Sequence, residues 1–118
     1  MDIKLKRVYE PYAEDDGIRI LVDRLWPRGI KKEDARIDRW FKEIAPSNEL
    51  RKWYNHEPEK FEAFSQKYHA EIDKTKALSE LLDYIKQHKT VTLVFSSKEL
   101  ALNNAVVLKT IIDDHIAL

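Results

Sequence analysis

Two short runs of apolar residues limit most strongly what this chain can fold into. Residues 18–23 (IRILVD) and 90–95 (TVTLVF) are dense in leucine and β-branched residues. Such runs are typical of strands buried on both faces of a parallel sheet. Segments with helical periodicity lie between them. The sequence therefore predicts an α/β fold: a small, mainly parallel sheet flanked by helices in a three-layer sandwich of flavodoxin-like or Rossmann-like type.

Weaker patterns supply the other elements. Residues 3–8 (IKLKRV) alternate apolar and basic side chains, as expected of a half-exposed edge strand. Residues 36–44 have mixed spacing, for which we expect a third strand or a distorted turn. Residues 57–74 and 76–88 each carry an apolar stripe at helical spacing. Both are predicted to be helices that bury this stripe in the core.

Capping residues mark where the helices begin. Ser47 precedes a short helical segment, and Pro58 suits a first helical position because its missing N–H costs nothing there. Ser96, with Glu99 three residues later, has the pattern of a capping box. We therefore expect the last helix to begin directly after strand 90–95 and to run through Ile112.

Composition restricts the classes of function. The 118 residues contain no linker or repeat, which predicts a single domain, 1–118. The 21 basic and 21 acidic residues produce no overall field that attracts nucleic acid or an anionic membrane, so neither partner is expected. The sequence shows no secretory leader and no apolar run of membrane-spanning length, so we expect a cytoplasmic location.

Several kinds of chemistry do not fit this sequence. It has no cysteine and two glycines, which excludes thiolate sites, dinucleotide fingerprints and Walker-type phosphate loops. The four histidines lie far apart without metal-ligand spacing, so neither a metal nor a cofactor is expected. The acidic clusters at 14–16 (EDD) and 113–114 (DD) are interpreted as a solvated turn and a helix end.

The segment 21–29 (LVDRLWPRG) carries the strongest candidate site. Asp23 and Arg24 follow a buried strand, at the edge where open α/β sheets bind ligands. Arg24 and Arg28 together can grip a phosphate or a carboxylate. Trp26 precedes a proline and is therefore extended, so that it can stack on a ligand or line the pocket. The alternative is structural: Asp23 and Arg24 pair with other strand ends, and Trp26 fills the core.

A second candidate segment is 95–99 (FSSKE). Because the N-terminus of a helix attracts anions, Ser96 and Ser97 are expected to offer free backbone amides, to which Lys98 adds a positive charge. The helix start after Ser47 offers a third group of amides. All three segments open on the same edge of a parallel sheet, which predicts one anion-binding hollow there.

Three strings cover nearly the whole chain: LVDRLWPRG, IAPSNELRKWYNHEPEKFEAFSQKYHAEI and VTLVFSSKELALNNAVVL. Together they resemble the YeaO-like proteins, the family of domain of unknown function 488. The resemblance implies a small bacterial α/β domain of cytoplasmic type, without an established reaction. It also implies a His-Asn-His string at the start of the last helix, where this chain has Leu102, Asn103 and Asn104. If those histidines do acid–base or metal work in the family, this chain lacks that equipment.

Two hypotheses about function follow. In the first, the chain is an enzyme for a small anionic molecule that bears phosphate or carboxylate, such as a nucleotide, with Asp23 as its candidate base. In the second, it is a non-catalytic module that senses a ligand or contacts a partner. The ligand-binding candidates are Arg24, Trp26, Arg28, Ser96, Ser97, Lys98 and Asn103.

Overall fold

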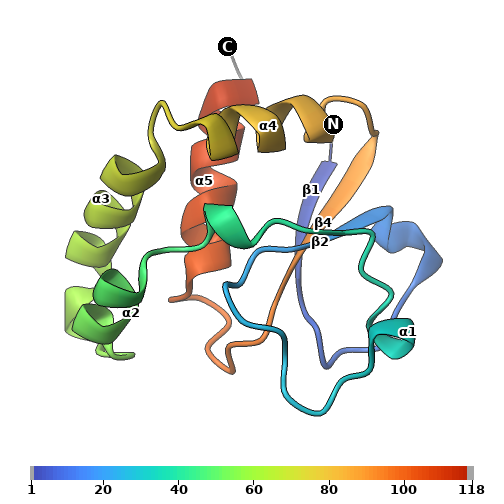
Figure 1. The fold of residues 1–118 in the computed structure, drawn as a ribbon, viewed down its shortest axis with the longest axis horizontal. Helices are drawn as coiled ribbons and strands as arrows, with labels where there is room; N and C mark the ends of the chain where they lie inside the picture. The colour runs from blue at the N-terminus through green and yellow to red at the C-terminus, as the bar shows by residue number, and fades with distance from the viewer. Residues whose placement is uncertain (1, 117–118) are drawn as a thin grey trace.

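The computed structural model describes residues 2–116 (Figure 1). Within that range the strands are β1 (Asp2–Arg7), β2 (Ile18–Leu21), β3 (Arg39–Trp40) and β4 (Thr90–Phe95). The α-helices are α1 (Lys32–Ala35), α2 (Asn48–Tyr54), α3 (Phe61–Ile72), α4 (Lys76–Ile85) and α5 (Asn104–Ile116). Short 3₁₀ turns form at Glu14–Asp16, Lys42–Ile44 and Pro58–Lys60.

The strands are parallel and lie in the order β1–β4–β2–β3. β1 pairs with β4 along its whole length, from Asp2 opposite Thr90 to Arg7 opposite Phe95. β2 pairs with β4 on one side and with the two-residue β3 on the other. The predicted α/β fold with a small parallel sheet is confirmed, and the strand expected at 3–8 is an edge strand.

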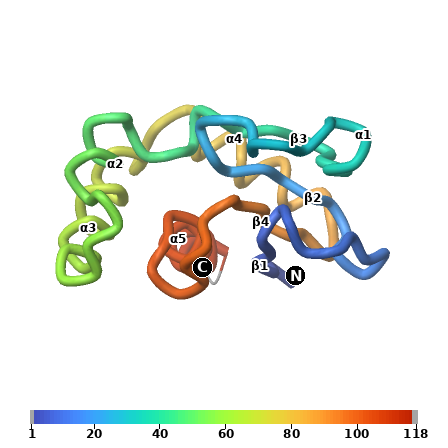
Figure 2. Tube along the Cα trace, turned by 90° about the horizontal axis from the view of Figure 1, so that it is seen from below, coloured from blue at the N-terminus to red at the C-terminus, as the bar shows by residue number. Residues whose placement is uncertain are grey.

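Helices cover one face of this sheet. Ile3, Ile20 and Leu93 point from the three longer strands into the larger core, which the helices α2 to α5 complete. Phe64 and Leu81 represent the stripes predicted for 57–74 and 76–88, and both side chains are buried there. In Figure 2, α3 and α5 lie on one side of the strands and α1 lies at the opposite end.

A smaller core covers the other face of the sheet. Leu21 and Val94 from the strands pack there with Ala35 of α1 and with Trp26 and Trp40. The two indole rings meet edge to face, with 5.6 Å between ring centroids. The outer layer on this side is thus the segment 24–37, in which α1 is a single turn of helix.

The helix start predicted at Ser47 is confirmed, and the start predicted at Pro58 is a 3₁₀ turn ahead of α3. The Ser47 hydroxyl accepts a hydrogen bond from the Leu50 N–H at 3.1 Å, which caps α2. Pro58 opens the 3₁₀ turn that leads into α3. The segment 36–44 contains both a strand, β3, and a turn, Lys42–Ile44.

The start of the last helix differs from the prediction. α5 begins at Asn104, and Asn103 caps it by accepting a hydrogen bond from the Val106 N–H at 3.0 Å. Ser96 does not cap a helix, because its hydroxyl donates to an aspartate on the neighbouring strand end. The Glu99 carboxylate binds two N–H groups within the loop itself. The capping box expected at 96–99 is therefore wrong, and residues 96–103 form a loop.

A buried ion cluster lies beneath the segment that carries α1. Arg19 of β2 is only 2% exposed, and its Nη1 donates to Asp16 Oδ2 at 2.6 Å. Its Nε and Nη2 donate to two backbone carbonyls at the end of α1. Lys6 Nζ donates to Asp16 Oδ1 at 2.9 Å. The interpretation of residues 14–16 as a solvated turn is therefore wrong for Asp16, which is 3% exposed.

Candidate functional site

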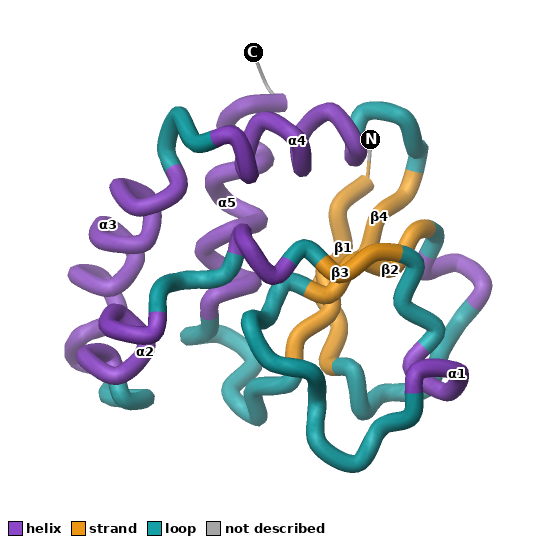
Figure 3. The backbone as a smooth tube through the Cα atoms, in the orientation of Figure 1, coloured by secondary structure: helices purple, strands orange, loops and turns teal. Residues whose placement is uncertain are grey.

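The carboxyl ends of β1, β2 and β4 continue into loops at one edge of the sheet (Figure 3). Asp23 follows β2, and Ser96 follows the neighbouring strand β4. The two residues are hydrogen-bonded to each other. The structure thus brings the candidate segments 21–29 and 95–99 together, as the parallel arrangement of their strands requires.

Asp23 ties these loops to α5. Its Oδ2 accepts hydrogen bonds from the Ser96 N–H at 2.9 Å and from the Ser96 hydroxyl at 2.8 Å. Its Oδ1 accepts from Asn104 Nδ2 at 3.2 Å, and its carbonyl accepts from the Trp40 indole at 2.7 Å. Both carboxylate oxygens therefore have partners within the fold. The Ser96 amide that was expected to bind an anion is bound by this carboxylate.

Replacement of Asp23 by asparagine is expected to lower the free energy of unfolding by about 1–3 kcal/mol, because an amide nitrogen cannot accept the bonds that a carboxylate oxygen accepts. Urea unfolding measures the difference. Asp34→Asn on the exposed surface of α1 is the matched control and should change stability by less than about 0.5 kcal/mol. Equal stability of Asp23→Asn and the wild type would contradict the structural role of Asp23.

The third predicted group of amides is also occupied by a carboxylate of the chain. Glu71 of α3 accepts hydrogen bonds from the Ser47 N–H at 2.9 Å and from the Ser47 hydroxyl at 2.5 Å. The start of α2 therefore has its own anion. The Ser47 and Ser96 amides, which were expected to be free, are thus both bound by carboxylates of the chain.

Arg28 and Lys98 have exposed side chains. Within residues 2–116 neither side chain forms a hydrogen bond or an ion pair. Tyr9 donates its hydroxyl to the Arg28 carbonyl at 3.0 Å, and the Arg7 guanidinium lies 4.8 Å from the Tyr9 ring centroid. Arg7 also donates to the carbonyls of residues 96 and 97, next to Lys98. We call Arg7, Arg28 and Lys98 the basic rim.

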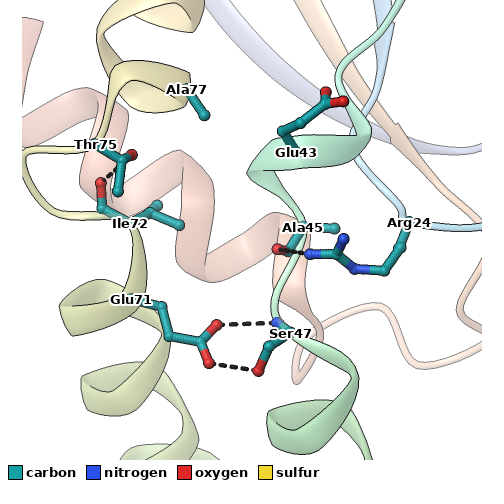
Figure 4. A pocket seen from close by; sticks show the side chains of 8 residues that line it. All are labelled: Arg24, Glu43, Ala45, Ser47, Glu71, Ile72, Thr75 and Ala77. Carbon is teal, nitrogen blue, oxygen red and sulfur yellow. Dashed lines mark hydrogen bonds between the residues drawn. The ribbon is translucent and has the colours of Figure 1, made fainter.

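Arg24 lies apart from the basic rim. Its Nη2 donates to the Ala45 carbonyl at 3.0 Å, and its Nε donates to the Pro46 carbonyl at 3.3 Å. These carbonyls belong to the segment after β3. In the strand order, β3 is the edge strand on the other side of the sheet from β1, the strand that Tyr9 follows. Arg24 also lines a pocket of about 340 Å³ (Figure 4). Of the two guanidinium groups expected to grip one anion, that of Arg24 is thus held by the segment after β3, whereas that of Arg28 has no partner within residues 2–116.

Trp26 and Asn103 serve the fold. The Trp26 indole donates to the Ile30 carbonyl at 2.7 Å, and its ring belongs to the smaller core. Asn103 is 3% exposed and donates to the Glu99 carbonyl at 2.7 Å, in addition to capping α5. The Ser97 hydroxyl accepts from the Glu99 N–H within the loop. The structural interpretation of Trp26, in which its ring fills the core, thus agrees with the geometry.

Two buried tyrosines donate hydrogen bonds beneath the edge. The Tyr68 hydroxyl donates to the Ile44 carbonyl at 2.6 Å, and the Tyr54 hydroxyl donates to the Leu102 carbonyl at 2.9 Å. Burial raises the pKa of both hydroxyl groups. For Tyr68 the Asp23 and Glu71 charges raise the pKa further, whereas Arg24 opposes them. Both hydroxyl groups therefore stay neutral and act as donors at physiological pH.

Two other kinds of site do not occur in the described range. Residues 2–116 contain no cluster of three or more histidine, aspartate or glutamate side chains arranged to hold a metal ion. No helix among these residues is both long and apolar enough to cross a membrane.

Several residues that shape this edge were not among the sequence candidates. Arg7 and Tyr9 belong to the end of β1 and its loop, and their position beside β4 follows from the parallel pairing. The assignment of 3–8 as an edge strand could have identified Arg7 as a third strand-end residue. Nothing near Ser47 in the sequence indicates that Glu71 binds it, because only the packing of α2 against α3 brings them together.

Comparison with known proteins places the chain among relatives of its own size. YeaO, an uncharacterised protein of Escherichia coli (strain K12), is 46% identical over 108 residues, which cover 92% of this chain and 94% of YeaO. An uncharacterised protein of Mycobacterium tuberculosis (strain H37Rv) is 42% identical over 111 residues, which cover 94% of this chain and 93% of the relative. No solved structure matches.

The family comparison agrees with these relatives. A family described as "Inactive DUF488-N3 subclade" matches residues 2–117, which is nearly the full length. The resemblance to YeaO-like proteins that the three strings indicated is confirmed. The chain therefore belongs to the inactive DUF488-N3 subclade.

Proposed function

We propose that this chain is a non-catalytic module that binds a small anionic molecule, bearing phosphate or carboxylate groups, at the basic rim. The observation that carries the proposal is the chain of contacts from Arg28 through Tyr9 and Arg7 to residues 96–97. These contacts hold the loops after β1, β2 and β4 together and leave the Arg28 and Lys98 side chains exposed beside them.

The state of Asp23 supports binding over catalysis. Both Asp23 oxygens accept hydrogen bonds, and one donor is Asn104, which stands where the resemblance implies a histidine. An asparagine amide holds the carboxylate but cannot transfer protons as an imidazole does. The family description "Inactive" supports the same choice.

Local charge at the basic rim favours an anion. The two carboxylates closest in sequence to the rim residues are Glu10 and Glu99. Glu10 accepts a hydrogen bond from the Arg7 N–H at the end of β1, and Glu99 accepts from two N–H groups of the loop 96–103. Arg28 and Lys98 thus keep their charge available, and a guanidinium can bind phosphate or carboxylate through two parallel hydrogen bonds. Because the chain has no net charge, binding depends on this local arrangement.

Replacement of Arg28 and Lys98 together by alanine is expected to weaken anion binding at least about tenfold, since each charged hydrogen bond contributes about 1.5–3 kcal/mol. Unfolding stability should stay within about 0.5 kcal/mol of the wild type, because neither side chain has a partner within residues 2–116. Isothermal titration with phosphate, pyrophosphate, AMP and citrate, against chloride at equal ionic strength, measures the affinity.

The control variant carries Lys76→Ala and Lys86→Ala, which removes the same charge from the exposed surface of α4 and its end. It should bind each anion as the wild type does. Equal loss in both double variants would show that binding depends only on net charge. No saturable binding of any of these anions to the wild type would refute the proposal.

A further inference from the structure

The pocket beside Arg24 is separate from the basic rim and has a different chemistry. It lies between the turn Lys42–Ile44, the end of α3 and the start of α4 (Figure 4). Its volume of about 340 Å³ is at the lower end of small-molecule pockets. The lining residues are Arg24, Glu43, Ala45, Ser47, Glu71, Ile72, Thr75 and Ala77.

Arg24 supplies the positive side of the pocket. Its Nε and Nη2 are held by the carbonyls of Pro46 and Ala45, which fix the plane of the guanidinium. Its Nη1 has no partner within residues 2–116, and Arg24 forms no ion pair there. A guanidinium held in this way keeps two N–H donors for a carboxylate and loses little entropy when it binds one.

Glu43 and Glu71 supply the negative side. The Ser47 N–H and hydroxyl hold the Glu71 carboxylate in place, and its oxygens keep further lone pairs. Glu43 is exposed and forms no hydrogen bond or ion pair with any residue in 2–116. An ammonium group, with three N–H donors, can pair with carboxylates of this kind.

Charge balance selects the class of ligand. A simple anion would satisfy Arg24 and would be repelled by Glu43 and Glu71, whereas a simple amine would be repelled by Arg24. A molecule with one carboxylate and one ammonium group pairs with both sides. Ala45, Ile72 and Ala77 give the pocket small apolar surfaces, which suit a short aliphatic group.

We infer that this pocket binds a small zwitterion of the α-amino acid class, with the ligand carboxylate on Arg24 and its ammonium group on Glu43 and Glu71. This site is independent of the anion site proposed at the basic rim. It shares no residue with Arg7, Arg28 and Lys98, so each proposal can fail without the other.

In the test, the whole chain is titrated with the common L-amino acids one at a time. Amide chemical shifts in NMR spectra report the binding. At least one amino acid should bind saturably and shift the amides of Thr75 and Ala77. For that amino acid, the analogue without the ammonium group and the analogue without the carboxylate should each bind at least about tenfold more weakly. Absence of saturable binding by every amino acid, or equal affinity for a single-charge analogue, would overturn the inference.

Glu43→Gln tests the pocket without disturbing the fold, because Glu43 is exposed and makes no bond within the described range. It should weaken amino acid binding at least about tenfold. Glu62→Gln, on the exposed surface of α3 and outside the pocket, should leave the affinity unchanged, and so should the double variant of Arg28 and Lys98. Unchanged affinity in Glu43→Gln, or equal loss in Glu62→Gln, would overturn the inference.

Discussion

Replacement of Asp16 by asparagine is expected to lower the free energy of unfolding by about 3–5 kcal/mol, as found when one partner of a buried ion pair is removed. Arg19 would remain buried at 2% exposure without the carboxylate that it contacts at 2.6 Å, and Lys6 would lose the same partner. Small domains have about 5–15 kcal/mol of stability in total, so this change removes a large fraction. Urea unfolding at neutral pH measures it.

Asp15→Asn is a matched control for this prediction. The Asp15 side chain is 83% exposed, and its carboxylate lies 3.9 Å from Lys4, so its removal should cost less than about 1 kcal/mol. A similar loss of stability in both variants would mean that the charge of the turn matters rather than the buried pair. A stable Asp16→Asn variant would contradict the cluster as described.

The buried pair of Asp16 and Arg19 also makes the free energy of unfolding depend on pH in a defined direction. Burial alone would raise the pKa of Asp16, but hydrogen bonds from Lys6, the Ala13 N–H and Arg19 outweigh it and lower the pKa. The stabilisation by the carboxylate is therefore complete above the unfolded-state pKa of about 4, and it is lost as the pH falls through the lower folded-state value. The stability difference between the wild type and Asp16→Asn should shrink only below pH of about 4.

Gly17→Ala is expected to destabilise the chain by about 3 kcal/mol or more, because backbone strain and a collision add together. Gly17 has a φ of +68° and a ψ of −139°, a combination that residues with a Cβ rarely adopt. A Cβ at this position would lie 2.2 Å from the Thr90 carbonyl oxygen at the start of β4. Relief requires β2 and β4 to move apart. Thermal and urea unfolding measure the loss.

Gly29→Ala separates the two causes. Gly29 also has a positive φ, of +76°, but a Cβ there would meet no atom within 4 Å. Its replacement should cost only the backbone term, about 1–2 kcal/mol. If the two alanine variants were equally stable, the close approach of Gly17 to β4 would have no energetic effect, in disagreement with the structure.

The central strands could be predicted from the sequence because their burial is nearly complete. The run 90–95 coincides with β4, where neighbours on both faces and both edges demand apolar or β-branched residues. Arg19 stands inside the other apolar run, and its burial could be suspected from that position. Its partner Asp16 could not be identified, because the adjacent acidic residues of the turn have the same local pattern, and only the fold selects one of them.

The meeting of segments 21–29 and 95–99 could be predicted, but the partners of their polar groups could not. The location of this meeting follows from parallel strands, whose carboxyl ends share an edge. Whether the backbone amides there are free cannot be read from the sequence, because the carboxylate that binds each amide is distant in sequence. Asp23 reaches Ser96, and Glu71 reaches Ser47, only once the strands and helices have packed. Sequence spacing identifies residues that suit an anion, whereas the folded chain decides whether its own carboxylates bind there first.

The strand order has a consequence for synthesis on the ribosome. β4 lies between β1 and β2, and Asp2 pairs with Thr90. Strand β1 must therefore wait until β4 has been synthesised before it gains its neighbour. Until then the nascent chain offers unpaired strand edges to other polypeptides. We expect this domain to complete its fold only after β4 has left the exit tunnel, with earlier protection by chaperones that bind apolar segments.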